Sequence, residues 1–155
     1  MSAAASTWDP QFFLPFPRNC VSLLTSPSNT GKSTYIQSIL ENAHLFFAQP
    51  FDRVVVVNCH SQVSTYQLQQ LPSCPWPVAQ VEHFLISEFY TDILQPNDVV
   101  ILEDLQQVTS NVKLLVTTIA HHSDLSALFI VTHALLGTRQ FELLSYVHKV
   151  ILFCK

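Results

Sequence analysis

The stretch TSPSNTGKSTY, from Thr25 to Tyr35, decides the fold, because it has the spacing of a phosphate-binding loop, G-x-x-x-x-G-K-[ST]. In this pattern backbone N–H groups, a lysine and a hydroxyl surround the phosphates of a nucleotide. Gly31, Lys32 and Ser33 match the last three positions, whereas Ser26 stands in place of the first glycine. We interpret the stretch as a phosphate-binding loop with an altered turn.

The loop residues have distinct expected roles toward ATP and Mg²⁺. Lys32 would reach the outer phosphates, and the Ser33 hydroxyl would ligate Mg²⁺. The alternative is a chance Gly-Lys-Ser in a helix-capping loop, which is improbable because the chain has only two glycines, Gly31 and Gly137. The full expected nucleotide-binding set is Ser26, Pro27, Ser28, Asn29, Thr30, Gly31, Lys32, Ser33 and Thr34.

Five short apolar runs rich in β-branched residues predict strands that are buried on both faces. They are Val21–Leu24, Val54–Val57, Val99–Leu102, Leu128–Val131 and Val150–Phe153. Helical spacing of apolar residues predicts helices at Ser33–Phe47, Val63–Leu71, Asn111–His122 and Thr138–Tyr146. Strands that alternate with helices indicate an α/β fold. With the phosphate loop, we expect a three-layer α/β/α P-loop domain around a mainly parallel sheet.

The chain length of 155 residues predicts one domain. Residues 1–18 have the composition of an arm without regular structure, which leaves 19–155 as the P-loop ATPase domain. A membrane-spanning helix needs about 18 consecutive apolar residues, and no apolar run in this sequence is that long. We therefore expect no membrane partner. The start of the chain lacks a signal-peptide pattern and the four cysteines are scattered. We therefore expect free thiols and an intracellular protein, not a secreted one.

The charge balance limits the classes of function. Net charge is −4, and the seven lysines and arginines are scattered rather than gathered in a basic stripe. This pattern argues against tight DNA binding by one isolated subunit. It leaves room for a ring in which each subunit contributes one or two cations. A small-molecule kinase is disfavoured because no arginine-rich insert is present to clamp an acceptor phosphate.

The run VVILEDL, Val99–Leu105, is an apolar strand that ends in two carboxylates. Phosphoryl transfer needs one acid near the Mg²⁺ and another group that orients the attacking water. By their order, Glu103 would face the metal together with Ser33, and Asp104 would polarise the water. The alternative is an acidic cap on the following helix, since Asp is a favoured N-cap.

A further polar strand end is LFIVTH, which finishes in Thr132 and His133. His133 is a candidate catalytic residue that would touch the γ-phosphate or its water. The alternative, a turn residue at a strand end, stays open. Arg53 and Arg139 are candidates for an arginine that acts on the site of a neighbouring subunit. For either one, a surface salt bridge is the alternative.

The chain resembles the genome-packaging ATPases of large and mid-sized DNA viruses, of the poxvirus and Polinton/Maverick type, in the FtsK–HerA superfamily of P-loop motors. The similarity extends from about Phe16 to the end of the chain. The segments that carry it are VSLLTSPSNTGKST, RVVVVN, SQVSTYQLQQL, VVILEDL, LVTTIAHHSDLSALFIVTHALL and RQFELLSYVHKVILFCK.

The resemblance implies that Lys32, Ser33, Glu103 and Asp104 handle ATP and Mg²⁺. It also implies a homo-oligomeric ring that moves double-stranded DNA into a capsid, with capsid or portal-type proteins as further partners. Such a protein would act in the nucleus or cytoplasm of the host cell and enter the virion.

Three positions depart from the family pattern. They are Ser26, Glu103 in place of a more usual Asp, and Thr132-His133 in place of a Gln or Asn. The alternative function is therefore a catalytically weakened P-loop protein that acts as a nucleotide-binding or scaffolding module in virion assembly.

Overall fold

The computed structural model describes residues 16–25, 31–59, 66–105, 109–122, 124–132 and 143–152. The elements in chain order are β1 Cys20–Thr25, α2 Lys32–Glu41, the 3-10 helix η2 Ala43–Leu45, β2 Arg53–Asn58, β3 Gln80–Leu85, the 3-10 helix η3 Thr91–Ile93, β4 Val99–Leu105, α3 Ser110–His122, β5 Ala127–Thr132 and β6 Lys149–Leu152. Each of the five apolar runs forms a strand, although Phe153, at the end of the last run, lies outside the described residues.

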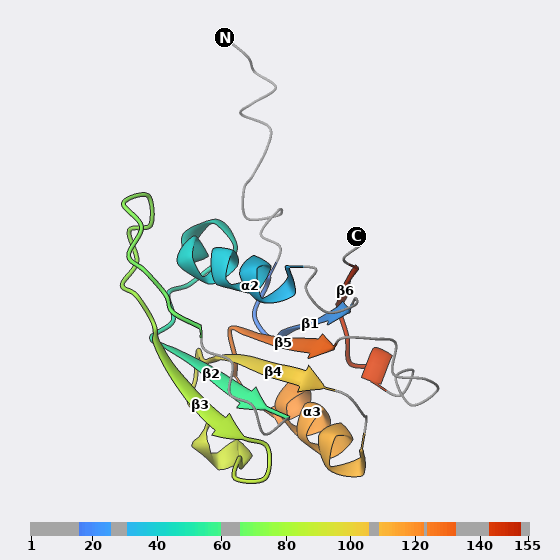
Figure 1. The fold of residues 1–155 in the computed structure, drawn as a ribbon. Helices are drawn as coiled ribbons and strands as arrows, with labels where there is room; N and C mark the ends of the chain where they lie inside the picture. Colours follow the sequence, from blue (N-terminus) through green and yellow to red (C-terminus); the bar gives the residue numbers. More distant parts are fainter. Residues whose placement is uncertain are drawn as a thin grey trace.

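The strands form one sheet in the order β3-β2-β4-β5-β1-β6 (Figure 1). Every strand pair is parallel, which confirms the prediction of an α/β fold with a mainly parallel sheet. Strand β5 lies between β1 and β4, and β2 continues the sheet beyond β4. Because the strands are parallel, all their carboxyl ends lie along the same edge of the sheet.

Helices cover both faces of the sheet (Figure 1). Successive residues of a strand point to opposite faces, so each apolar run supplies two separate cores. On the α2 face, Ile36 and Ile39 pack with alternate strand residues such as Val56 and Ile101. On the α3 face, the core contains Val57, Leu102, Ile130, Val116 and Ile119. Burial of both faces explains why these strands are continuously apolar.

Helix α2 is shorter than predicted. We expected a helix over Ser33–Phe47, but α2 ends at Glu41 and η2 follows. The cause is Asn42, whose backbone N–H and side-chain amide both donate to the carbonyl of Ser38, at 3.1 and 2.9 Å. This double contact closes the last turn. The apolar residues beyond it, including Phe47, still reach the same core.

The predicted helix over Val63–Leu71 is wrong for residues 66–71, which have no regular secondary structure. Residues 63–65 lie outside the described part of the chain. The prediction also missed edge strand β3, because its sequence QVEHFL is neither continuously apolar nor strictly alternating. Helix α3 confirms the prediction for Asn111–His122. Of the predicted helix Thr138–Tyr146, Leu143 and Leu144 are helical, residues 145–146 form a turn, and residues 138–142 are not described.

Phe16 joins the core although it lies within the predicted arm. It is 1% exposed and forms a parallel bridge with Phe47. Its ring stacks on Phe47 at 5.5 Å and meets Phe129 edge-on at 5.0 Å. Residues 1–15 of the predicted arm lie outside the described residues. The chain is thus anchored on the α2 face before β1 begins.

An ion-pair cluster fixes the amino ends of β2, β3 and β4. Both oxygens of buried Asp98 accept hydrogen bonds from Arg53, at 2.5 and 3.1 Å, and Glu82 lies 3.2 Å from the same guanidinium. The hydrogen bond with Asp98 raises the pKa of Arg53 above its ordinary value. Of the two roles open for Arg53, the structure supports the salt bridge. Arg139 lies outside the described residues.

Among the residues that the structure describes, no helix is both long and apolar enough to cross a membrane. Cys20, Cys59 and Cys74 are free thiols. Cys20 is buried in β1, and this burial raises the pKa of its thiol. Cys154 is not described.

We predict that Asp98→Ala lowers the free energy of unfolding by about 3–5 kcal/mol, because it removes the buried carboxylate that is the main partner of the partly buried Arg53 guanidinium. Urea denaturation measures the loss. The matched control is Asp124→Asn, which removes the more exposed pair with Arg18 and should cost less than about 1 kcal/mol. Equal losses in the two variants would contradict the assigned role of the buried pair.

Candidate functional site

The start of α2 has a glycine in the left-handed conformation at its N-cap. Gly31 is the N-cap and has φ 91° and ψ 16°, a left-handed conformation that glycine adopts without strain. The Gly31 carbonyl accepts the first helical hydrogen bond from Tyr35, at 2.8 Å. No acidic residue occupies the first turn of α2. The free N–H groups of a helix start attract anions, so this end of α2 is suited to phosphate.

The two residues after Gly31 lie in different surroundings. Lys32 is 4% exposed, which is rare for a lysine, whereas Ser33 is exposed at the surface. A buried ammonium group needs polar surroundings. Two buried hydroxyl residues, Thr25 of β1 and Thr132 of β5, are register partners at adjacent strand ends on the carboxyl edge of the sheet. The loop residues Ser26, Pro27, Ser28, Asn29 and Thr30 lie outside the described residues.

Glu103 is the centre of the described site. Its side chain is 3% exposed. The Ser33 hydroxyl donates to its Oε1 at 3.4 Å, across 70 positions of sequence. The Tyr66 hydroxyl donates to the same oxygen at 3.2 Å. The structure therefore brings together Ser33 and Glu103, the two residues that the sequence analysis proposed as Mg²⁺ ligands.

A bulge in β4 lies beside this contact. Leu102 pairs with Ile130 of β5, but the next pair is Leu105 with Thr132. Three steps along β4 therefore match two steps along β5, so one extra residue is inserted at Glu103-Asp104. Bulges of this kind redirect side chains and are common next to active sites. The backbone of Asp104 belongs to β4. Its side chain and all of His133 lie outside the described residues.

Two residues of this site were not predicted from the sequence. Asn58, at the carboxyl end of β2, is 2% exposed and is the register partner of Glu103. Like Thr132, Asn58 is a polar residue at the end of an apolar run. The same sequence pattern could therefore have identified Asn58 as a candidate site residue. Tyr66 follows no strand and carried no such signal. Its position depends on a segment without regular secondary structure.

A polar cleft of about 260 Å³ opens at this site. Its α2 side chains recur every three to four positions and therefore share one face of the helix. The cleft is lined by Ser33, Thr34, Gln37, Ser38, Glu41, Tyr66 and Glu103. The hydroxyls and carboxylates of this lining suit a hydrated cation or polar groups better than an apolar ligand.

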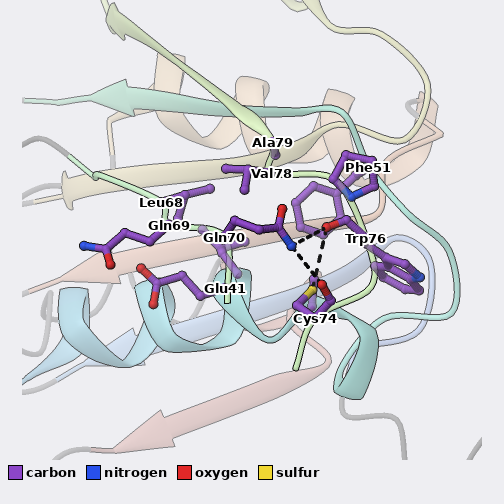
Figure 2. A pocket seen from close by; sticks show the side chains of 12 residues that line it. Glu41, Phe51, Leu68, Gln69, Gln70, Cys74, Trp76, Val78 and Ala79 are labelled. Atoms are coloured by element: carbon purple, nitrogen blue, oxygen red, sulfur yellow. Dashed lines mark hydrogen bonds between the residues drawn. The ribbon is translucent and has the colours of Figure 1, made fainter. Parts of the chain in front are cut away.

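A second hollow, near the C-terminal end of α2, is far smaller (Figure 2). Its volume is about 10 Å³, roughly the space of one water molecule. The Gln70 amide points toward Cys74 and Trp76 and donates to their carbonyls at 2.8 and 3.3 Å. This hollow is too small for a nucleotide, so the cleft beside Glu103 is the better candidate.

The donor set at the cleft fits Mg²⁺. This ion prefers oxygen ligands, keeps several waters, and uses one or two carboxylates of the protein together with substrate phosphates. Adjacent ligands of octahedral Mg²⁺ lie about 3.0 Å apart when each bond is about 2.1 Å. Ser33 Oγ and Glu103 Oε1 are 3.4 Å apart, close to that spacing. Within the described ranges, no group of three or more His, Cys, Asp or Glu side chains could hold a metal.

Comparisons with protein-family profiles, with curated proteins and with solved structures find no match to this chain. The function must therefore be inferred from the contacts of Ser33 and Tyr66 with Glu103, from the burial of Lys32 and from the sequence motifs.

We predict that Gly31→Ala lowers the free energy of unfolding by about 1–2 kcal/mol, because a Cβ disfavours the left-handed backbone. No atom lies within 4 Å of the added Cβ, so the cost is conformational rather than a clash. Gly31→Asn should cost less, since Asn tolerates this conformation and can cap the helix. Thermal unfolding of both variants measures the difference. Equal stability of Gly31→Ala and the wild type would contradict the left-handed conformation of Gly31.

Proposed function

We propose that the chain is a Mg²⁺-dependent ATPase of the P-loop class that works as a DNA-packaging motor. The observation that carries the proposal is the contact of Ser33 with Glu103. A hydroxyl directly after a Gly-Lys pair and a carboxylate at a strand end are the two protein groups that P-loop ATPases place around Mg²⁺. They meet here although 70 positions separate them in the sequence.

In this proposal, different described residues would bind the phosphates and the Mg²⁺ of the nucleotide. The start of α2 would hold phosphate oxygens through its backbone N–H groups, and Lys32 would balance their charge. Ser33 and Glu103 would hold the Mg²⁺, which neutralises charge on the transferred phosphoryl group. Burial of Lys32 and Glu103 strengthens their interactions, because the local dielectric constant is lower than in water. Preorganisation of this kind stabilises the transition state.

The remaining assignments extend the proposal to the reaction itself. Asp104 would orient the attacking water, and His133 would contact the γ-phosphate or that water. The bulge at Glu103-Asp104 supports a functional role for this strand end, since a regular strand would continue its pairing with β5.

The motor function follows the sequence resemblance to viral genome-packaging ATPases. A ring of copies would place DNA in a central channel, where each subunit needs to supply only a few cations. This suits a chain of net charge −4. Capsid or portal-type proteins would be further partners, and the setting would be the infected host cell and the virion. Because Arg53 is paired with Asp98 inside the subunit, a different arginine would have to act on a neighbouring site.

We predict that Lys32→Ala abolishes ATP binding and lowers Mg²⁺-dependent hydrolysis at least about 100-fold, since it removes a charge that stabilises the transition state. The measurement is phosphate release with and without duplex DNA, which should stimulate the wild type. Lys113→Ala, on α3 at the opposite face of the sheet, is the matched control and should keep full activity.

Lys32→Met preserves the buried aliphatic stem and separates loss of charge from loss of packing. It should be as inactive as Lys32→Ala while unfolding at the wild-type temperature. A wild-type protein that neither binds nor hydrolyses ATP at concentrations where it assembles would refute the motor proposal. That result would favour the alternative of a scaffolding module in virion assembly.

A further inference from the structure

The hydroxyls of Tyr66 and of the proposed magnesium ligand Ser33 both contact one carboxylate oxygen of Glu103. The Tyr66 hydroxyl donates to Oε1 of Glu103 at 3.2 Å, and the Ser33 hydroxyl donates to the same atom at 3.4 Å. Tyr66 is 4% exposed, and its ring belongs to the core on the α2 face. A phenylalanine would fill the same space, so the hydroxyl is the part of this residue that packing does not explain.

The segment that carries Tyr66 is held firmly despite its lack of regular secondary structure. Leu68 and Trp76 pack against the core on the α2 face. Gln70 ties the segment to itself, because its amide donates to the carbonyls of Cys74 and Trp76 (Figure 2). The segment then continues into β3. The position of the Tyr66 hydroxyl at Glu103 is therefore fixed by packing and hydrogen bonds.

We infer that Tyr66 is a positioning residue whose hydroxyl orients Glu103 toward Mg²⁺ and so sets the affinity of the nucleotide complex for that ion. The inference rests on the proposed function. Carboxylates that ligate metals are commonly fixed by a further hydrogen bond, and loss of that partner costs about 10–100-fold in metal affinity or activity. A carboxylate has about four lone-pair sites, so a donor on Oε1 leaves capacity for the cation.

A residue that orients Glu103 should affect nucleotide binding only when Mg²⁺ is present. A purely structural residue should affect nucleotide binding with and without Mg²⁺. Nucleotide binding without metal would use Lys32 and the start of α2. Only the Mg²⁺-dependent part of the affinity passes through Glu103. Removal of the hydroxyl should therefore change the response to Mg²⁺ and leave metal-free binding unchanged.

We predict that Tyr66→Phe raises the Mg²⁺ concentration needed for half-maximal binding of the non-hydrolysable analogue AMP-PNP by about 10–100-fold. Its affinity for AMP-PNP in EDTA should equal that of the wild type. Isothermal titration calorimetry over a range of Mg²⁺ concentrations measures both quantities. Tyr146→Phe makes the same chemical change on the opposite face of the sheet and should alter neither.

A double-mutant cycle with Glu103→Gln keeps the test independent of small losses in stability. Once Glu103 is replaced, adding Tyr66→Phe should cause no further shift in the Mg²⁺ dependence. Additive shifts, or an unchanged Mg²⁺ dependence in Tyr66→Phe, would overturn the role of Tyr66 and leave the proposed ATPase intact. Failure of the wild type to bind AMP-PNP at any Mg²⁺ concentration would instead remove the proposed function and this inference with it.

Discussion

The parallel direction of all six strands is the constraint on which the rest of the structure depends. It brings the carboxyl ends of β1, β2, β4 and β5 to one edge, and at each of these ends a polar residue is buried. These residues are Thr25, Asn58, Glu103 and Thr132. Polar groups are costly to bury without partners, so these residues need hydrogen-bond partners at this edge, which is where the candidate site lies. The other, apolar residues of the same strands form the core.

The two edges of the sheet have opposite properties. At the amino edge, Arg53 and Asp98 satisfy each other within the subunit, with Glu82 as a third member. At the carboxyl edge, Glu103 receives hydroxyl donors, which a cation can supplement or replace. An ion pair whose charged groups are already satisfied within the subunit stabilises the fold. Few of its hydrogen-bonding groups remain available to a ligand.

The sequence predicts the centre of the sheet well and its periphery poorly. Strands β1, β2, β4, β5 and β6 are continuous apolar runs, a pattern that burial on both faces imposes. Strand β3 is a half-buried edge strand whose residues do not obey that rule. Helix α2 ends where the Asn42 side chain binds the carbonyl of Ser38. The spacing of apolar residues cannot predict this end point. The mistaken helix before Pro72 shows that a short helical spacing can arise in an extended segment.

The same division holds for the candidate site. Lys32, Ser33 and Glu103 were predictable because each belongs to a local pattern with a chemical reason for its residue types. Asn58 was within reach of the reasoning used for Thr132. Tyr66 was not, since its contact with Glu103 spans 37 positions and depends on the course of a segment without helix or strand. Contacts of this kind depend on tertiary structure alone.

The segment that carries Tyr66 contains Pro72, Pro75 and Pro77. Each proline ring restricts φ in the unfolded chain as well as in the folded one. Where the native backbone accepts it, a proline favours folding by about 0.4–1 kcal/mol, chiefly through the smaller entropy of the unfolded state. A connection with no ladder of hydrogen bonds thereby becomes ordered at reduced entropic cost. The restriction of these three φ angles is already present in the denatured ensemble, before the segment packs against α2.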